Sequence, residues 1–142
     1  MSEPVTLSYG PAPEQAGELY LPPAGGPLVC LFHGGFWRVP HDRTQCAAIA
    51  RDLAGRGYAV WNLGYRRVGA GGHSWPAIRE DVDAILATIG TLGEAHPAVD
   101  LRRVVFVGHS AGGHLAFWAA ARRARAGSRF HVAGALGLAP IL

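Results

Sequence analysis

The 142-residue sequence contains no lysine, and all thirteen of its basic residues are arginine. This absence excludes a P-loop phosphate site, a Schiff-base enzyme and a Ser–Lys dyad, because each requires a lysine side chain. Residues 1–100 hold seven arginines and ten acids, net −3, whereas residues 101–142 hold six arginines and no acid, net +6. The arginines occur singly or in pairs without interleaved aromatics, so we expect no nucleic acid as a partner.

Cysteines and membrane-type segments are also scarce. Cys30 and Cys46 are too few for a disulfide framework and lie in apolar patterns, which predicts buried, reduced thiols and a cytoplasmic protein. The first residues have neither the basic start nor the apolar stretch of a signal peptide. Val104–Ala121 carries no charge, but the segment Gly108–His114 suits a turn better than a spanning helix, so we expect no membrane association.

Strand and helix patterns alternate along most of the chain, and 49% hydrophobic residues suffice for a core. Two short strands, Val5–Tyr9 and Glu18–Leu21, precede the alternation. Apolar runs typical of buried strands then recur at Leu28–Phe32, Tyr58–Leu63, Arg103–Val107 and Val132–Leu138. Helical patterns lie between them, at about 42–56, 74–92 and 111–124. This order predicts a mostly parallel sheet with helices on both faces, whose ligands bind at the carboxyl ends of the strands.

A Gly-x-Ser-x-Gly pattern, Gly108–Gly112, lies directly between a predicted strand and a predicted helix. Such a turn exposes the serine hydroxyl, strains its backbone and requires small residues two positions away. The helix N-terminus behind it favours the negative charge that develops during acyl transfer. The pattern can arise by chance among 20 glycines, but its context predicts that Ser110 is a nucleophile.

His33–Trp37, with the sequence His-Gly-Gly-Phe-Trp, follows the first buried strand. Adjacent glycines allow the backbone to approach a ligand closely, so the N–H groups of Gly34, Gly35 and Ala111 are candidates for an oxyanion hole. A turn that needs glycine for its backbone conformation is the alternative. Because the serine turn lies 77 residues further along, at the end of another predicted strand, the two motifs together favour the oxyanion hole.

The two motifs resemble those of the α/β-hydrolase superfamily, in particular its arylformamidase (kynurenine formamidase-like) and esterase branches. Three segments between them are also similar to those esterases, namely Tyr65-Arg66, Trp75-Pro76 and Asp81-Val82. The resemblance runs from about residue 17 to residue 142. It implies the α/β-hydrolase fold, an ester or amide substrate, Ser110 as nucleophile, no metal or cofactor, and a structural ion pair between Arg66 and Asp81. Phe36 stands where lipases carry a third glycine, which favours the formamidase-like branch.

A catalytic serine needs a base and an orienting acid, which in this fold follow it in the order acid, then histidine. No Asp or Glu follows Ser110. Two histidines follow Ser110, and the first, His114, fits a packed position in a helix. The second, His131, precedes the last strand and so lies at the amino end of the sheet, opposite Ser110. Asp100 also precedes a strand and is expected at that same end. No metal-type spacing is present. We therefore expect residues 1–142 to be the N-terminal portion of a single hydrolase domain whose C-terminal strands, acid and base are missing.

These features predict a serine hydrolase that cleaves a carboxylic ester or an aryl formamide through an acyl-enzyme on Ser110. Phe36, Trp37 and Trp75 are expected to line the acyl or aryl pocket. Two alternatives stay open: a catalytically incomplete fragment or binding module of the same fold, and a peptidase of the same fold. Because a parallel sheet that ends at Leu138 exposes an apolar edge, we also expect self-association of the isolated chain.

Overall fold

The computed structural model describes residues 3–35, 37, 41–68, 74–123 and 129–141. Its strands are β1 Val5–Ser8, β2 Ala16–Tyr20, β3 Gly26–Phe32, β4 Ala59–Leu63, β5 Val99–His109 and β6 Val132–Leu138. Its helices are the 3₁₀ turn η1 Arg43–Cys46 and the α-helices α1 Ala47–Gly55, α2 Trp75–Ala95 and α3 Ala111–Arg123. Within these residues, each strand and helix expected from the sequence is present.

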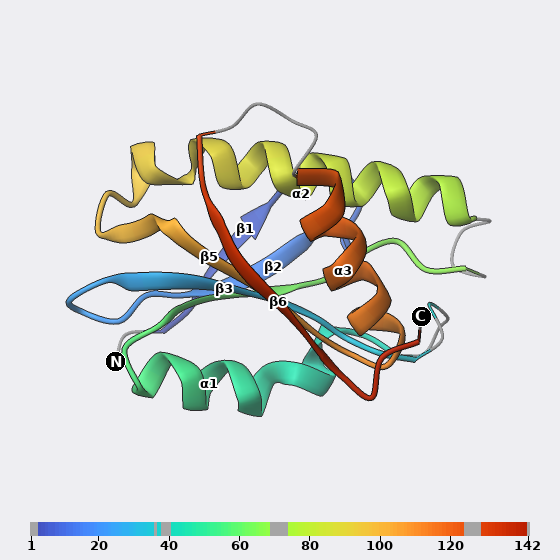
Figure 1. The fold of residues 1–142 in the computed structure, drawn as a ribbon, viewed down its shortest axis with the longest axis horizontal. Coiled ribbons are helices and arrows are strands. Elements are labelled where there is room, and N and C mark those ends of the chain that lie inside the picture. Colours follow the sequence, from blue (N-terminus) through green and yellow to red (C-terminus); the bar gives the residue numbers. More distant parts are fainter. Residues whose placement is uncertain (1–2, 36, 38–40, 69–73, 124–128, 142) are drawn as a thin grey trace.

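The strands form one sheet in the order β1-β2-β4-β3-β5-β6. β1 and β2 join it in antiparallel fashion, whereas β4, β3, β5 and β6 run parallel to one another. α1 covers one face, and α2 with α3 covers the other (Figure 1). The predicted mostly parallel sheet with helices on both faces is confirmed, and its parallel strands end on the side where α3 begins.

Local sequence explains where the central elements begin and end. β4 is buried along its whole length, and β3 is buried from Leu28 onward, because helices cover both faces of these strands. Ser74 is extended just before α2, and Pro76 lies in the first turn, where a missing N–H costs little. After α1, Gly57 adopts a φ of +97°, and the N–H groups of Gly57 and Tyr58 donate back into the last helical turn.

β5 begins at Val99, four residues before the predicted strand. Asp100 already pairs with β3, the register then shifts, and regular pairing resumes at Val104. Arg102 and Arg103 lie within that shift, and both donate to the carboxylate of Asp100. Two exposed arginines interrupt the apolar pattern, which is why the sequence placed the start of the strand too late.

A buried carboxylate ties three segments together. Asp81 on α2 is 0% exposed and accepts hydrogen bonds from Gln15 Nε2 at 2.9 Å, from the Arg66 backbone N–H at 2.7 Å and from Arg66 Nε at 2.9 Å. The guanidinium Nη2 of Arg66 lies 2.8 Å from the same carboxylate. The structural ion pair implied by the resemblance is therefore confirmed, and it joins α2 to the loop before β2 and to the segment after β4.

β6 is the last strand of the sheet on one side. Leu136 is 53% exposed and Leu138 is 42% exposed, unlike the buried side chains of β3 and β4. Phe117 on α3 is exposed beside this strand, where it approaches Gly137. An apolar edge of this kind can pair with another chain, so self-association stays a prediction that the exposed side chains support.

Candidate active site

Ser110 lies between the last residue of β5 and the first residue of α3, at the carboxyl end of the parallel strands. Its φ of +53° is in the left-handed region, which is strained for a residue with a side chain. Three hydrogen bonds hold this conformation: the Ser110 N–H donates to the Leu138 carbonyl at 2.8 Å, and the Ser110 carbonyl accepts from Gly113 at 2.9 Å and from Ile141 at 3.1 Å. The turn is thus fixed by α3 and by the segment that follows β6.

Glycine at both flanking positions is a steric requirement. A Cβ at Gly112 would lie 2.0 Å from the carbonyl oxygen of Phe32, and one at Gly108 would lie 2.0 Å from the carbonyl oxygen of Gly112. The first contact brings the start of α3 directly against the end of β3. Because of this close approach, Ser110 lies beside the segment that begins at His33.

The Gly34 N–H does not have the role of oxyanion donor that the sequence predicts. It donates to Oε1 of Gln45 on η1 at 2.8 Å, so in this structure it is not free to bind a substrate oxyanion. Gly35 adopts a φ of +114°, which only glycine accepts readily, and Ala111 is the first residue of α3, where the N–H has no partner within the helix. The expected set of oxyanion donors therefore reduces to Gly35 and Ala111.

The side chain of His33 packs beneath the backbone of Gly34 and binds its carbonyl oxygen. It is 1% exposed, its Nδ1 donates to the Gly34 carbonyl at 2.8 Å, and its ring stacks on Tyr65 with the centroids 4.2 Å apart. Burial lowers the pKa of His33 to about 4, so the ring is neutral at pH 7 with its proton on Nδ1. The Tyr65 hydroxyl donates to the His33 carbonyl at 2.9 Å. A cavity of about 480 Å³ adjoins both rings, and Glu18, Arg43 and Arg67 contribute to its lining.

Three aromatic rings meet beside the start of α3. Trp37 lies edge-on to Trp75 and to His114, with ring centroids 5.5 and 5.6 Å apart, and Trp75 lies 5.5 Å from His114. Trp37 lies two residues after Gly35 and has a φ of +60°, so these contacts hold a second strained residue. The structure therefore brings the predicted pocket residues Trp37 and Trp75 together and adds His114, whereas Phe36 lies outside the described residues.

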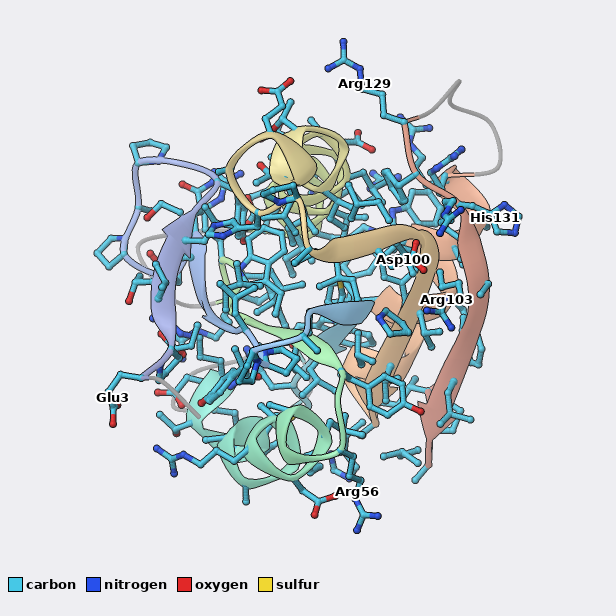
Figure 2. All side chains as sticks on the ribbon, turned by 90° about the vertical axis from the view of Figure 1, so that its left-hand side faces the viewer. Glu3, Arg56, Asp100, Arg103, Arg129 and His131 are labelled. Atoms are coloured by element: carbon cyan, nitrogen blue, oxygen red, sulfur yellow. The ribbon has the colours of Figure 1, made fainter. Side chains whose placement is uncertain are left out.

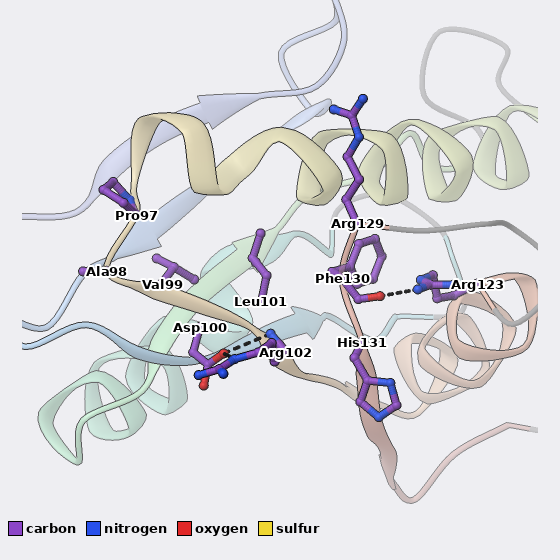
Figure 3. A pocket seen from close by; sticks show the side chains of 10 residues that line it. All are labelled: Pro97, Ala98, Val99, Asp100, Leu101, Arg102, Arg123, Arg129, Phe130 and His131. Atoms are coloured by element: carbon purple, nitrogen blue, oxygen red, sulfur yellow. Dashed lines mark hydrogen bonds and ion pairs between the residues drawn. The ribbon is translucent and has the colours of Figure 1, made fainter.

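Asp100 and His131 lie at the starts of β5 and β6, at the amino end of the sheet (Figure 2), whereas Ser110 follows the carboxyl end of β5. They line a cavity of about 680 Å³ together with Arg102, Arg123 and Arg129. Its charged side chains are directed to different partners (Figure 3): Arg102 binds Asp100, and Arg123 donates to the Phe130 carbonyl. Arg129 extends toward α2, where its Nη1 lies 3.9 Å from Glu94 Oε1. The predicted placement of Asp100 and His131 at this end is confirmed, and neither side chain serves the serine.

Metal sites and membrane-spanning helices are absent from the part of the chain that the structure describes. There, no group of three or more His, Cys, Asp and Glu side chains is placed to hold a metal ion. No helix within the same residues has the length and apolar character needed to cross a membrane. Cys30 and Cys46 are free and buried, as predicted.

A serine on a strained strand-to-helix turn at the carboxyl end of a parallel sheet is the arrangement of an α/β hydrolase. Comparison with known proteins agrees with this class. Residues 18–131 match the BD-FAE family, and the chain belongs to this family of α/β-hydrolase-type esterases.

Solved esterases share the fold. Esterase B from Lactobacillus rhamnosis, in a structure described with a tributyrin phosphonate, is 28% identical with a TM-score of 0.78, over 96% of this chain and 48% of that chain. Esterase Est2 from Thermogutta terrifontis is 22% identical with a TM-score of 0.78, over 99% of this chain and 54% of that chain. A bacterial heroin esterase is 23% identical with a TM-score of 0.75, over 98% of this chain and 44% of that chain. The chain thus spans about half the length of these esterases.

One curated protein also matches. The FAD-linked oxidoreductase pytB of Aspergillus terreus is 31% identical over 125 residues, which make up 86% of this chain and 14% of that protein. The match concerns a small part of pytB, whereas its name describes the whole protein. It therefore carries no conclusion about the chemistry of this chain.

Proposed function

We propose that Ser110 is the nucleophile of an acyl-transfer site that cleaves carboxylic esters or aryl formamides. The observation that carries the proposal is the left-handed φ of +53° at Ser110, on the turn between β5 and the N-terminus of α3. That conformation holds the hydroxyl out from the turn, beside a helix N-terminus that favours developing negative charge. The glycine segment after β3 packs against the same turn and brings further backbone donors to it.

In the proposed reaction, Ser110 Oγ attacks the carbonyl carbon and its proton passes through a base to the departing alcohol or arylamine. The N–H groups of Gly35 and Ala111 stabilise the oxyanion of the tetrahedral intermediate. Water then attacks the acyl-enzyme, releases the acid and restores the serine hydroxyl. We place the base and its orienting acid outside residues 1–142, because no acid follows Ser110 and the chain spans about half of the related esterases.

The substrate class follows from the aromatic wall and the relatives. Trp37, Trp75 and His114 offer flat apolar surface beside the turn, which suits an aryl group or a short acyl chain. The likeness to Esterase B at 28% identity favours a carboxylic ester. An aryl formamide remains our proposal on the basis of the His-Gly-Gly-Phe-Trp sequence after β3. The two buried free thiols suit a reducing compartment such as the cytoplasm.

Hydrolysis of p-nitrophenyl butyrate and of formanilide tests the proposal. Because p-nitrophenolate leaves without being protonated, we expect Ser110 and the oxyanion donors to release it faster than buffer alone even without the base, and the Ser110→Ala variant to release it more slowly than the parent chain. Equal release by both chains would overturn the role of Ser110. Faster turnover of formanilide than of a matched anilide of a longer acid would support the formamidase branch, and the reverse order would refute it.

A second candidate is a binding module that retains the site geometry without catalysis. The position of His114 favours it, because this ring, one turn into α3, is packed against two indoles. Under this alternative, a chain shown by circular dichroism to be folded releases no p-nitrophenol above the buffer rate. That result would remove activity from these residues and leave the family assignment unchanged.

A further inference from the structure

Gln45 lies outside the two motifs, yet its side chain reaches the proposed oxyanion segment, residues 33–35. It lies on η1, eleven residues after Gly34, and its Oε1 accepts the Gly34 N–H at 2.8 Å. Space around Gly34 is also tight, since a Cβ at this residue would lie 2.8 Å from the His109 carbonyl oxygen and 3.3 Å from Gln45 Oε1. Gly34 is thus held between η1 and the residue that precedes Ser110.

The support that carries Gln45 is itself anchored. The Asp42 carboxylate caps η1 by accepting the Thr44 N–H at 2.9 Å. Arg43 forms a bidentate pair with Glu18 of β2, with Nε 2.9 Å from the nearer carboxylate oxygen. Asn62 of β4 donates from Nδ2 to the Arg43 carbonyl at 2.8 Å. Because these contacts fix η1 to two strands, the backbone that carries the Gln45 side chain is held in place beside Gly34.

Two successive peptide groups are fixed by this arrangement. The His33–Gly34 peptide is held at both ends, with its carbonyl bound by the Tyr65 hydroxyl and its N–H bound by Gln45. The carbonyl of the Gly34–Gly35 peptide is bound by His33 Nδ1 at 2.8 Å. In a planar trans peptide the N–H points opposite to the carbonyl, so fixing these two planes also fixes the direction of the Gly35 N–H.

We propose that Gln45 is a positioning residue for the oxyanion hole, which acts by holding the Gly34 N–H so that the Gly35 N–H keeps its direction. This inference rests on the proposed function of Ser110. Preorganised donors stabilise a transition state because they need no rearrangement when charge develops. Loss of the Gln45 acceptor frees the first peptide plane to rotate and therefore loosens the second one.

Two variants of Gln45 and one matched control test this role. Gln45→Met keeps the length of the side chain and removes the acceptor, and Gln45→Glu restores an acceptor oxygen. Gln15→Met makes the same substitution at a glutamine of the Asp81 network, away from the oxyanion segment. Each chain is assayed for amide hydrogen exchange at Gly34 and for the rate at which a fluorophosphonate labels Ser110.

We expect Gln45→Met to speed exchange at Gly34 about fivefold, as for the loss of one ordinary hydrogen bond, and to slow labelling by a similar factor. Gln45→Glu is expected to restore slow exchange, and Gln15→Met to leave the Gly34 exchange rate and the labelling rate unchanged. Unchanged exchange in Gln45→Met would overturn the proposal. Faster exchange with unchanged labelling would overturn it too, since Gln45 would then be merely structural.

The two measurements also separate this inference from the proposed function. If the parent chain does not label at all, the catalysis proposed for these residues fails, as under the binding-module alternative. In that event the exchange rates still report whether Gln45 holds Gly34. A change of exchange at Gly34 without any labelling would therefore refute catalysis by these residues and, with it, the catalytic purpose of the Gln45 contact.

Discussion

Asp81→Asn is expected to lower the free energy of unfolding by about 3 kcal/mol. The Asp81 carboxylate is 0% exposed and accepts three hydrogen bonds, one from Gln15 and two from Arg66. Asparagine keeps one acceptor oxygen, removes the negative charge and turns an NH₂ group toward these donors. Breaking a buried ion pair costs about 3–5 kcal/mol. The lower end applies here, because the Arg66 side chain is 19% exposed and keeps Glu80 as a partner at 3.3 Å.

Urea unfolding at pH 7, followed by far-ultraviolet circular dichroism, measures this loss. Asp83→Asn is the matched control, since Asp83 lies two residues further along α2 and pairs with Arg122 in an ion pair whose side chains are 48% and 44% exposed. An exposed pair of this kind contributes about 0.5 kcal/mol or less. A loss below about 1 kcal/mol in Asp81→Asn, or one equal to that of the control, would refute the structural role of the buried carboxylate.

Three further predictions concern stability and association. The pKa of His33 falls from 6.5 to about 4 on folding, so protonation of this ring favours the unfolded chain. The free energy of unfolding should therefore be highest above pH 6.5 and decline by up to about 3 kcal/mol toward pH 4. A urea midpoint that does not change between these pH values, or a free energy of unfolding that depends equally on pH in His33→Asn, would contradict this. Gly112→Ala places a Cβ 2.0 Å from a carbonyl oxygen and should destabilise the fold by about 2 kcal/mol or more. By contrast, a Cβ at Gly90 on α2 meets open space, so Gly90→Ala should raise the stability of the fold by about 0.5–1 kcal/mol in thermal unfolding. Equal changes in stability for the two glycine variants would refute the claim that close backbone packing requires glycine at position 112. Leu136→Lys should reduce self-association of the chain in sedimentation velocity, whereas a monomeric parent would show that the β6 edge does not pair.

The fold could be predicted largely from local pattern. Burial of β3 and β4 requires apolar side chains, and these are visible in the sequence as continuous apolar runs. The alternation of strands with helices is visible in the same way, from the spacing of apolar residues. The Ser110 turn was equally visible, because glycine at Gly108 and Gly112 is imposed by backbone contacts that no other residue satisfies. The start of β5 was missed, since Arg102 and Arg103 occupy a register shift and interrupt the apolar pattern.

The site could be predicted only in part, because some of its contacts cross between elements. Gln45 is an exposed polar residue in a predicted helix, and nothing in its sequence neighbourhood distinguishes it from a solvated side chain. Its contact with Gly34 depends on how η1 docks on β2 and β4. For the same reason, the sequence suggested a Gly34 donor that the structure shows to be engaged. The packed position expected for His114 is consistent with its two indole contacts, but its partners were not foreseeable.

Fluorophosphonate labelling followed by peptide mapping tests the central claim most directly. The probe phosphonylates an exposed serine oxygen with loss of fluoride, a reaction that is slower without the base but still selects the displayed serine, and mass spectrometry identifies the modified residue. We predict one adduct on Ser110, retained in Ser74→Ala, whose serine precedes α2, and absent from Ser110→Ala. An adduct on another residue, or equal labelling of the Ser110→Ala chain, would contradict the assignment of Ser110 as the nucleophile.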